Sequence, residues 1–312
     1  MLATIVGLLL RAIVVLSGAA VITFALLWNA PGDPAQAIAM ARFDALLSED
    51  VIDQVRAEVG LDASFWVAFR DWVGPLLVLD FGNSAVTGRP VWPDLWAAIG
   101  YTFPLALVAL AIGIAVSLPL AYLATRRPGG VLDRCAVAIA SLGTAIPAFW
   151  LGLLLILLFA VQLAWLPAMG ARTPAHAILP ALTLGLGIAA SLTRIIRSGI
   201  LEARGQPFLP ALRRRGVAPR AVGKDHVARH AAVPVVTVLG LELAFLLEGL
   251  VVVEVIFGRP GLGTFLTSAI IARDFPHVQA VVVLTALVFV TVNLGIDVIY
   301  RLIDPRIGAR DA

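Results

Sequence analysis

Long runs without a charged side chain constrain this chain more than any other feature of its sequence. The longest of them cover residues 95–125 and 135–171. A bilayer core about 30 Å thick takes roughly 20 apolar residues in helical conformation, and a backbone in lipid must satisfy its hydrogen bonds within its own segment. Hydrophobic residues make up 60% of the 312 and charged residues only 14%, whereas soluble domains carry about 25% charged residues. The sequence therefore predicts an all-α polytopic membrane protein.

The apolar runs predict six transmembrane helices. The run at 135–171 is too long for one crossing, and Gln162, Trp165 and Pro167 mark where the chain should leave the membrane. No small-x-small cleavage site precedes Pro31, so we expect the first run to be retained as a signal anchor. The expected spans are 12–28, about 101–124, 135–161, 173–193, 234–254 and 275–296.

The distribution of basic residues predicts the orientation of these spans. Sixteen of the 23 Lys and Arg residues fall in loops on the side of the N-terminus, most of them between spans four and five. Because cytoplasmic loops are enriched in Lys and Arg, we expect both termini in the cytoplasm. The expected organisation is an N-terminal helix at 1–28, an extracytoplasmic loop domain at 29–94, a transmembrane core at 95–304 and a cytoplasmic tail at 305–312.

The loop at 29–94 resembles a small soluble domain. A short helix is predicted over residues 48–59, with Ser48 as its N-cap and Gly60 at its end. Aromatic side chains then recur at helical spacing, where they could pack on the membrane surface or on the tops of the spans: Phe65, Trp66, Phe69 and Trp72. A cap over the outer mouth is favoured over a catalytic domain.

The basic connection between spans four and five is the most informative segment. Residues 208–215 predict a short amphipathic helix, and Gly216 follows where a left-handed terminating residue belongs. His226, Arg229 and His230 are three or four residues apart and should share a helical face. Two interpretations stay open at this point: a loop that fixes topology or binds anionic lipid, and an element that docks onto a partner.

Catalytic and cofactor motifs are missing from the sequence. The single lysine, Lys224, lies outside any Walker A pattern, so a nucleotide site would belong to another subunit. The four histidines fall on both sides of the membrane and cannot converge on zinc. We therefore expect no enzyme activity, no metal site and no cofactor bound by this chain.

Carboxylates at membrane depth are costly and indicate functional positions by default. Glu242 and Glu248 are six residues apart and do not share a helical face. Glu254 could be satisfied by water or Arg259, and Asp297 could pair with Arg301 four residues later. For Glu248, buried pairing and pore lining remain equally open. All four acids are candidates for the translocation path or for intramembrane polar contacts.

Eight short motifs, in order along the chain, carry a family resemblance. They are PGDP at 31–34, DFGNS at 80–84, TGRPV at 87–91, IPAFWLG at 146–152, WLP at 165–167, ILPALTL at 178–184, EVIFGRPGLG at 254–263 and DPR at 304–306. In this order and spacing they resemble the membrane subunit of binding-protein-dependent ATP-binding-cassette (ABC) importers of the dipeptide, oligopeptide and nickel class.

The resemblance implies a type I ABC importer permease fold in the bacterial inner membrane, with a coupling loop at 200–231 that inserts into a partner ATPase. The coupling residues it implies are Phe208, Ala211, Arg213, Gly216, Val217, Arg220, His226 and Arg229. Implied partners are a second homologous permease subunit, two ATPase subunits that bind ATP and Mg, a solute-binding protein and membrane lipid, with no nucleic acid.

Some residues depart from the family pattern. Pro210 stands where Arg is usual and Leu212 where a small residue is usual, so the coupling helix could start later, since proline is tolerated only in the first helical turn. Glu242 stands where Gln is usual, and Glu248 where a small residue is usual.

Two other function classes fit the sequence less well. A gradient-driven secondary transporter would show inverted repeats and acids on interrupted helices, and no second half resembles the first. An intramembrane enzyme would need a catalytic constellation that the sequence does not contain. Within the importer class the solute stays open among dipeptides, longer peptides, nickel chelates and glutathione-like solutes.

Overall fold

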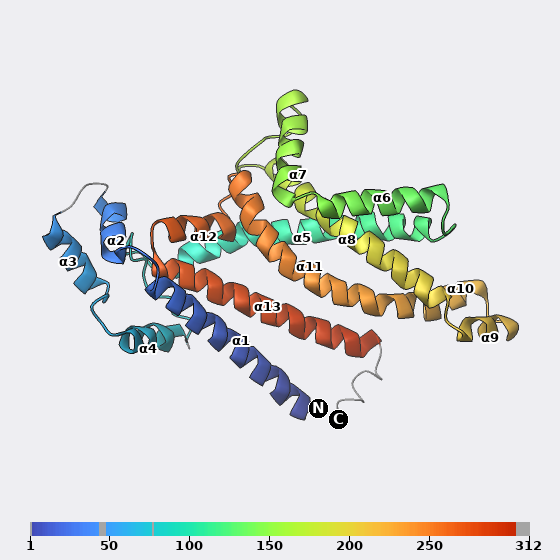
Figure 1. Ribbon diagram of the computed structural model, residues 1–312, viewed down its shortest axis with the longest axis horizontal. Helices are drawn as coiled ribbons and strands as arrows, with labels where there is room; N and C mark the ends of the chain where they lie inside the picture. Colours follow the sequence, from blue (N-terminus) through green and yellow to red (C-terminus); the bar gives the residue numbers. More distant parts are fainter. Residues whose placement is uncertain (1, 44–47, 77, 304–312) are drawn as a thin grey trace. The chain divides into compact units, whose positions relative to one another are not determined.

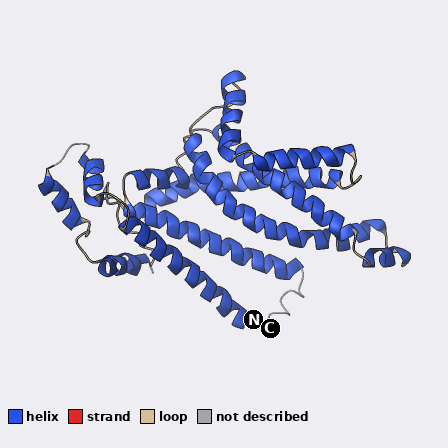
Figure 2. Cartoon of the chain, viewed as in Figure 1, coloured by secondary structure: helices blue, strands red, loops and turns tan. Residues whose placement is uncertain are grey.

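The computed structural model describes residues 2–43, 48–76 and 78–303, which are helical almost throughout (Figures 1 and 2). Within these ranges no residue belongs to a β-strand, and one isolated antiparallel bridge joins Asn83 to Pro90. The contacts divide the chain into two compact units. Unit 1 comprises Met1–Thr102 and Pro260–Thr291, and unit 2 comprises Phe103–Arg259 and Val292–Ala312.

Unit 1 holds the N-terminal helices and the loop domain. Its elements are α1 (Leu2–Trp28), α2 (Pro34–Phe43), α3 (Glu49–Glu58), α4 (Phe65–Leu76), the start of α5 (Val91–Ala124), α12 (Leu262–Ile271) and most of α13 (Phe275–Ile303). The short helix expected at 48–59 is confirmed as α3. Ser48 occupies its N-cap position in extended conformation, but the Ser48 side chain makes no capping hydrogen bond.

Aromatic rings join α4 to the end of α1. The Phe24 ring lies 5.2 Å from Phe65, 5.3 Å from Phe69 and 5.5 Å from Trp72, measured between ring centroids. The three partners lie on one face of α4 because they follow each other at helical spacing. The aromatic repeat therefore packs against the end of the first expected span, which is one of the two placements that the sequence allowed.

A buried polar cluster holds the turn between α12 and α13 against residues 84 and 85. Asp274 is 4% exposed. Its carboxylate accepts hydrogen bonds from Ser84 Oγ at 2.5 Å and from the Ala85 backbone N–H at 3.0 Å. The third contact, at 2.6 Å, joins Asp274 to His277 Nδ1. The contacts to Ser84 and Ala85 link residues about 190 positions apart, so they help to fix the tertiary structure of unit 1.

Unit 2 is built around α8 (Ile178–Arg204), which packs against α5, α6 (Val131–Ala145), α7 (Ala148–Leu155) and α11 (Ala228–Ile256). Glycines let α5 and α8 approach closely, as small residues do at helix interfaces in membranes. A Cβ atom at Gly185 would lie 2.7 Å from the Ile112 side chain, and one at Gly113 would lie 2.5 Å from Ile188.

The segment of the third expected span, 135–161, is not one continuous helix in the structure. The chain bends by 102° between α6 and the helix that begins at Ala148. Ile146 adopts extended backbone angles (φ −83°, ψ 122°), because the ring of a following proline disfavours helical geometry at the residue before it. After α7 the helix widens into a π-helical segment, η1 (Ile156–Gln162).

Four helices are long and apolar enough to cross a membrane, and the bent pair raises the number to five among the residues that the structure describes. The four are Val91–Ala124, Pro174–Arg204, Pro219–Ile256 and Phe275–Ile299. They contain the second, fifth and sixth expected spans and nearly all of the fourth, but extend beyond them. The first expected span, Ala12–Trp28, is found as a shorter apolar helix within α1.

Candidate coupling loop and intramembrane acids

The segment that follows α8 folds into a short helix with a glycine terminator. Helix α9 (Phe208–Arg214) ends before Gly216, whose φ is +76°. The Val217 backbone N–H donates to the Leu212 carbonyl oxygen at 3.2 Å, which is the long bond of a Schellman cap. No heavy atom lies within 4 Å of a Cβ built on Gly216. Glycine is therefore favoured there by its backbone conformation and not by lack of space.

Phe208 anchors α9 to the start of α11. Its ring centroid lies 6.1 Å from that of His226 and 5.2 Å from that of His230. The two histidines are four residues apart across η3 (Val222–Val227) and the first turn of α11, so they share a face as expected. Pro210 is the third residue of α9, within the first turn. The helix therefore tolerates this proline without starting later.

The remaining residues of the predicted coupling set are mostly exposed. Ala211, Gly216, Arg220 and Arg229 are exposed, Val217 is half-buried, and the Arg213 side chain lies outside the described residues. Lys224, in η3 after the short helix α10 (Pro219–Ala221), is also exposed. The inner side of the loop is closed by Leu209 and Val222, which are both buried. The arrangement leaves a basic outer surface available to a partner.

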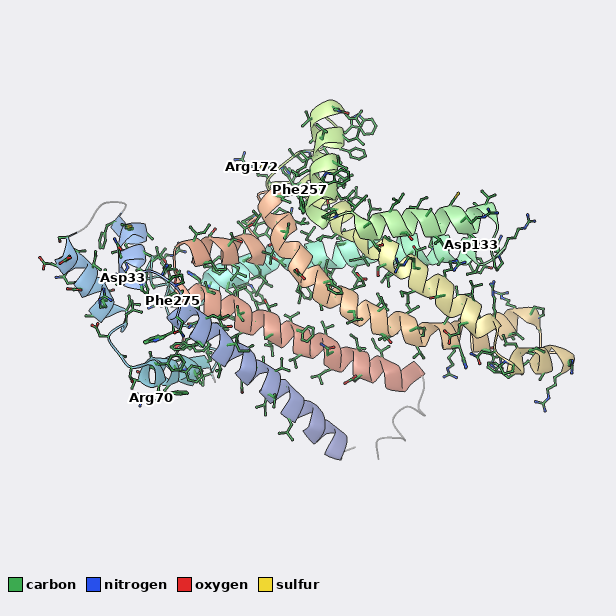
Figure 3. All side chains as sticks on the ribbon, in the orientation of Figure 1. Asp33, Arg70, Asp133, Arg172, Phe257 and Phe275 are labelled. Carbon is green, nitrogen blue, oxygen red and sulfur yellow. The ribbon has the colours of Figure 1, made fainter. Side chains whose placement is uncertain are left out.

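Two arginines hold the C-terminal half of α8 to the connection between α5 and α6. Asp133, near the start of α6 (Figure 3), is buried and accepts from Arg197 Nη2 at 2.7 Å and from the Gly129 backbone N–H at 2.8 Å. Arg204 donates to the Thr125 carbonyl oxygen. Sequence reasoning counted both arginines only as topology determinants. The available signal was Asp133 itself, the one carboxylate between Asp94 and Glu202.

The three acids of α11 lie in three different environments. Glu254 is fully buried and Glu242 is half-buried. Glu248 is exposed. Asp297 of α13 is half-buried, and Arg301, its expected partner, lies outside the described side chains. The acids therefore do not converge on a single site within unit 2. Among the described residues, no group of three or more His, Cys, Asp or Glu is placed to hold a metal ion.

Comparison with known protein families decides the class of the chain. Residues 117–309 match the family described as binding-protein-dependent transport system inner membrane component, and residues 1–104 match the N-terminal part of that membrane component. The chain belongs to this family. It is a multi-pass inner membrane protein and the permease subunit of an ABC importer.

Named relatives agree with the family assignment. The glutathione transport system permease protein GsiC of Salmonella typhimurium (strain LT2) is 40% identical over 296 residues, which cover 92% of this chain and 93% of the relative. GsiC of Escherichia coli (strain K12) is 38% identical over 295 residues, covering 92% of each chain. These relatives are transport permease subunits, and nothing in the comparisons supports the gradient-driven alternative.

Solved structures support the fold. A chain of the inward-facing MetNI methionine ABC transporter superposes with a TM-score of 0.57 at 20% identity, covering 67% of this chain and 96% of that one. A chain of an amino acid ABC transporter with histidines gives 0.54 at 19% identity, with 67% and 94% coverage. The expected ABC importer permease fold is therefore confirmed at the level of its helical architecture.

Proposed function

We propose that this permease passes peptides or a related small solute, such as glutathione, from a solute-binding protein into the cytoplasm. Its relatives are named as glutathione permeases, and the resemblance of its motifs extends to carriers of dipeptides, oligopeptides and nickel chelates. A second homologous permease subunit would complete the path, and two ATPase subunits would bind the ATP and Mg that drive transport.

The coupling role is proposed for the loop at 200–231. The observation that supports this role is the compact α9–Gly216 element. Phe208 anchors this element to α11. The helix before it, α8, is held to the α5–α6 connection by Arg197 and Arg204. A load applied to α9 by a moving ATPase would therefore reach three helices as a rigid-body displacement. The contact surface would comprise the exposed residues Ala211, Gly216, Arg220 and Arg229, together with Arg213 and Val217.

Six spans with both termini in the cytoplasm form the topology of this proposal. Helix α1 would be the first span, and the bent α6–α7 pair would serve as the third. The excess of Lys and Arg in loops on the N-terminal side supports this orientation. The four carboxylates Glu242, Glu248, Glu254 and Asp297 would lie at membrane depth.

The loop domain at 29–94 would receive the solute-binding protein. Its helices are held by ion pairs, from Arg42 to Glu58 at 2.8 Å and from Arg56 to Asp33 at 2.6 Å. The hydrogen bond from Arg42 lowers the pKa of the exposed Glu58 carboxyl. A domain of fixed shape beside α1 suits docking better than a disordered linker would.

Substitution of the terminating glycine tests the coupling role. We expect Gly216→Asp to reduce co-purification of the ATPase subunits by about tenfold, which corresponds to about 1.4 kcal/mol, and to abolish ATP-driven uptake. The new side chain would project from the docking surface with a charge, and it would also strain the left-handed backbone by roughly 1–2 kcal/mol.

Gly223→Asp is the matched control. It adds the same charge to the same loop, and Gly223 also has open space around its Cβ position but no positive φ. This variant should retain the complex. Wild-type yield and uptake from Gly216→Asp would refute the docking role of the loop.

A further inference from the structure

Within the described part of unit 2, one face of α11 is left uncovered. Beyond the first turn, every exposed residue of this helix falls on a single stripe, with successive members three or four positions apart. The stripe comprises Thr237, Leu241, Phe245, Glu248, Val252 and Val255. The large members are well exposed, Phe245 at 64% and Leu241 at 55%. At 1.5 Å per residue it runs for about 27 Å, which is close to the thickness of a bilayer core.

Glu248 is the one ionisable member of this stripe. A charged side chain at the centre of a transmembrane helix costs roughly 3 kcal/mol when it faces lipid. The other two acids of the helix lie off this stripe, with Glu254 fully buried and Glu242 half-buried. Lipid is therefore an unfavourable neighbour for the stripe that carries Glu248, and a water-filled path or a protein surface is a more favourable one.

A second copy of this chain, packed tightly against the stripe, would not offer the Glu248 carboxylate a favourable partner. A copy would present the same stripe, and two like charges in a desolvated seam repel each other. The described part of α11 beyond Arg229 contains no lysine or arginine that could neutralise a facing carboxylate. A cation that Glu248 could bind would therefore come from the solute or from a subunit that differs from this chain, and the yield of the complex distinguishes the two.

We infer that Glu248 lines the solute path and binds the ammonium or guanidinium group of cationic peptides, which makes it a specificity-determining residue of the permease. This inference rests on the proposed function. A peptide amino terminus and a lysine side chain both carry positive charge near pH 7, and charge-assisted hydrogen bonds to carboxylate are about twice as strong as neutral ones. Glutathione carries two carboxylates and one ammonium group, so its net charge is negative near pH 7 and Glu248 would favour a cationic peptide over it.

Uptake of two probes by the complete complex tests the inference. The probes are the tripeptide Ala-Lys-Ala and glutathione, measured in vesicles containing the permease subunits, the ATPases and the solute-binding protein. We expect Glu248→Gln to lower ATP-driven uptake of Ala-Lys-Ala by about tenfold, the loss typical of one charge-assisted contact, and to leave glutathione uptake unchanged or higher. Each solute is compared between variants that share one binding protein, so the selection made by that protein cancels.

Two further variants and the yield of the complex complete the experiment. Glu248→Asp keeps the charge and should keep the preference for Ala-Lys-Ala, while Glu242→Gln should change uptake of both probes alike.

Equal losses of uptake of both probes in Glu248→Gln, or no change in either, would overturn the inference. A wild-type complex that takes up glutathione but not Ala-Lys-Ala would also overturn it. A reduced yield of the Glu248→Gln complex would instead assign the residue to a subunit contact. If the wild-type complex shows no ATP-driven uptake of either probe, the proposed function itself fails.

Discussion

At the scale of single residues, Asp274 shows how one carboxylate organises a turn. Burial alone would raise the pKa of Asp274, but hydrogen bonds from His277 and Ser84 outweigh burial and hold the pKa below its ordinary value. The ionised form is therefore favoured in the folded state. No sequence pattern indicated this residue, because its partners Ser84 and Ala85 lie about 190 positions away, and the DFGNS motif that ends at Ser84 does not indicate what it contacts.

The lowered pKa predicts a pH dependence of stability. A group whose folded pKa lies below its unfolded value stabilises the fold above the unfolded pKa, here about 4, and this contribution is lost as pH falls through the folded pKa. We expect Asp274→Asn to lower the free energy of unfolding by about 2 kcal/mol at pH 7 and to weaken the dependence on pH below about 4. Thermal unfolding of detergent-solubilised protein, followed by tryptophan fluorescence, measures both effects.

Asp71→Asn serves as the control for this measurement. Asp71 is exposed and pairs only with its neighbour Arg70 among the described contacts, and surface pairs of this kind contribute about 0–1 kcal/mol. An Asp274→Asn variant with the stability and acid profile of Asp71→Asn would contradict the role of the buried cluster.

At the scale of elements, local signals predicted helices well and their interruptions poorly. The α9 helix with its Gly216 terminator and the α3 helix before Gly60 follow from patterns a few residues long. The bend at Ile146 also had a local signal, because Pro147 disfavours helical geometry at the residue before it. The third span was expected from the length of an uncharged run, and that length does not show where the chain changes direction. The link from Asp133 to Arg197 spans 64 positions and depends on how α6 and α8 pack, which the sequence alone did not reveal.

The bend between α6 and α7 predicts a distance. Spin labels on the native Cys135 and on Val161→Cys, both exposed positions, should lie about 25 Å apart when the two segments meet at 102°. A straight helix of the same length would separate them by about 39 Å. Electron–electron resonance between the labels measures the difference.

A label pair on an unbroken helix provides the comparison. Arg229→Cys and Val255→Cys on α11, in a Cys135→Ala background, have the same separation of 26 residues and should give about 39 Å. Equal distances for the two pairs would show that the third span is straight in the membrane.

At the scale of the whole molecule, the asymmetry of basic residues predicts which loops face the cytoplasm. A single cysteine introduced at Asp71, in the loop domain, should react with a membrane-impermeant maleimide in intact spheroplasts. One at Lys224 should react only after lysis. Both positions are exposed, and both variants carry Cys135→Ala, which alone should give no labelling. Labelling at Lys224 in intact spheroplasts would reverse the proposed orientation, because a loop outside the cell cannot contact a cytoplasmic ATPase.

The exposed position of Lys224 in η3 has a practical consequence. The chain contains no other lysine side chain, so a reagent that acylates primary amines has one internal target, and that target lies in the same loop as Gly216. Mass spectrometry of a single acylated peptide would then report whether this surface is shielded in the assembled transporter, with no engineered residue at all.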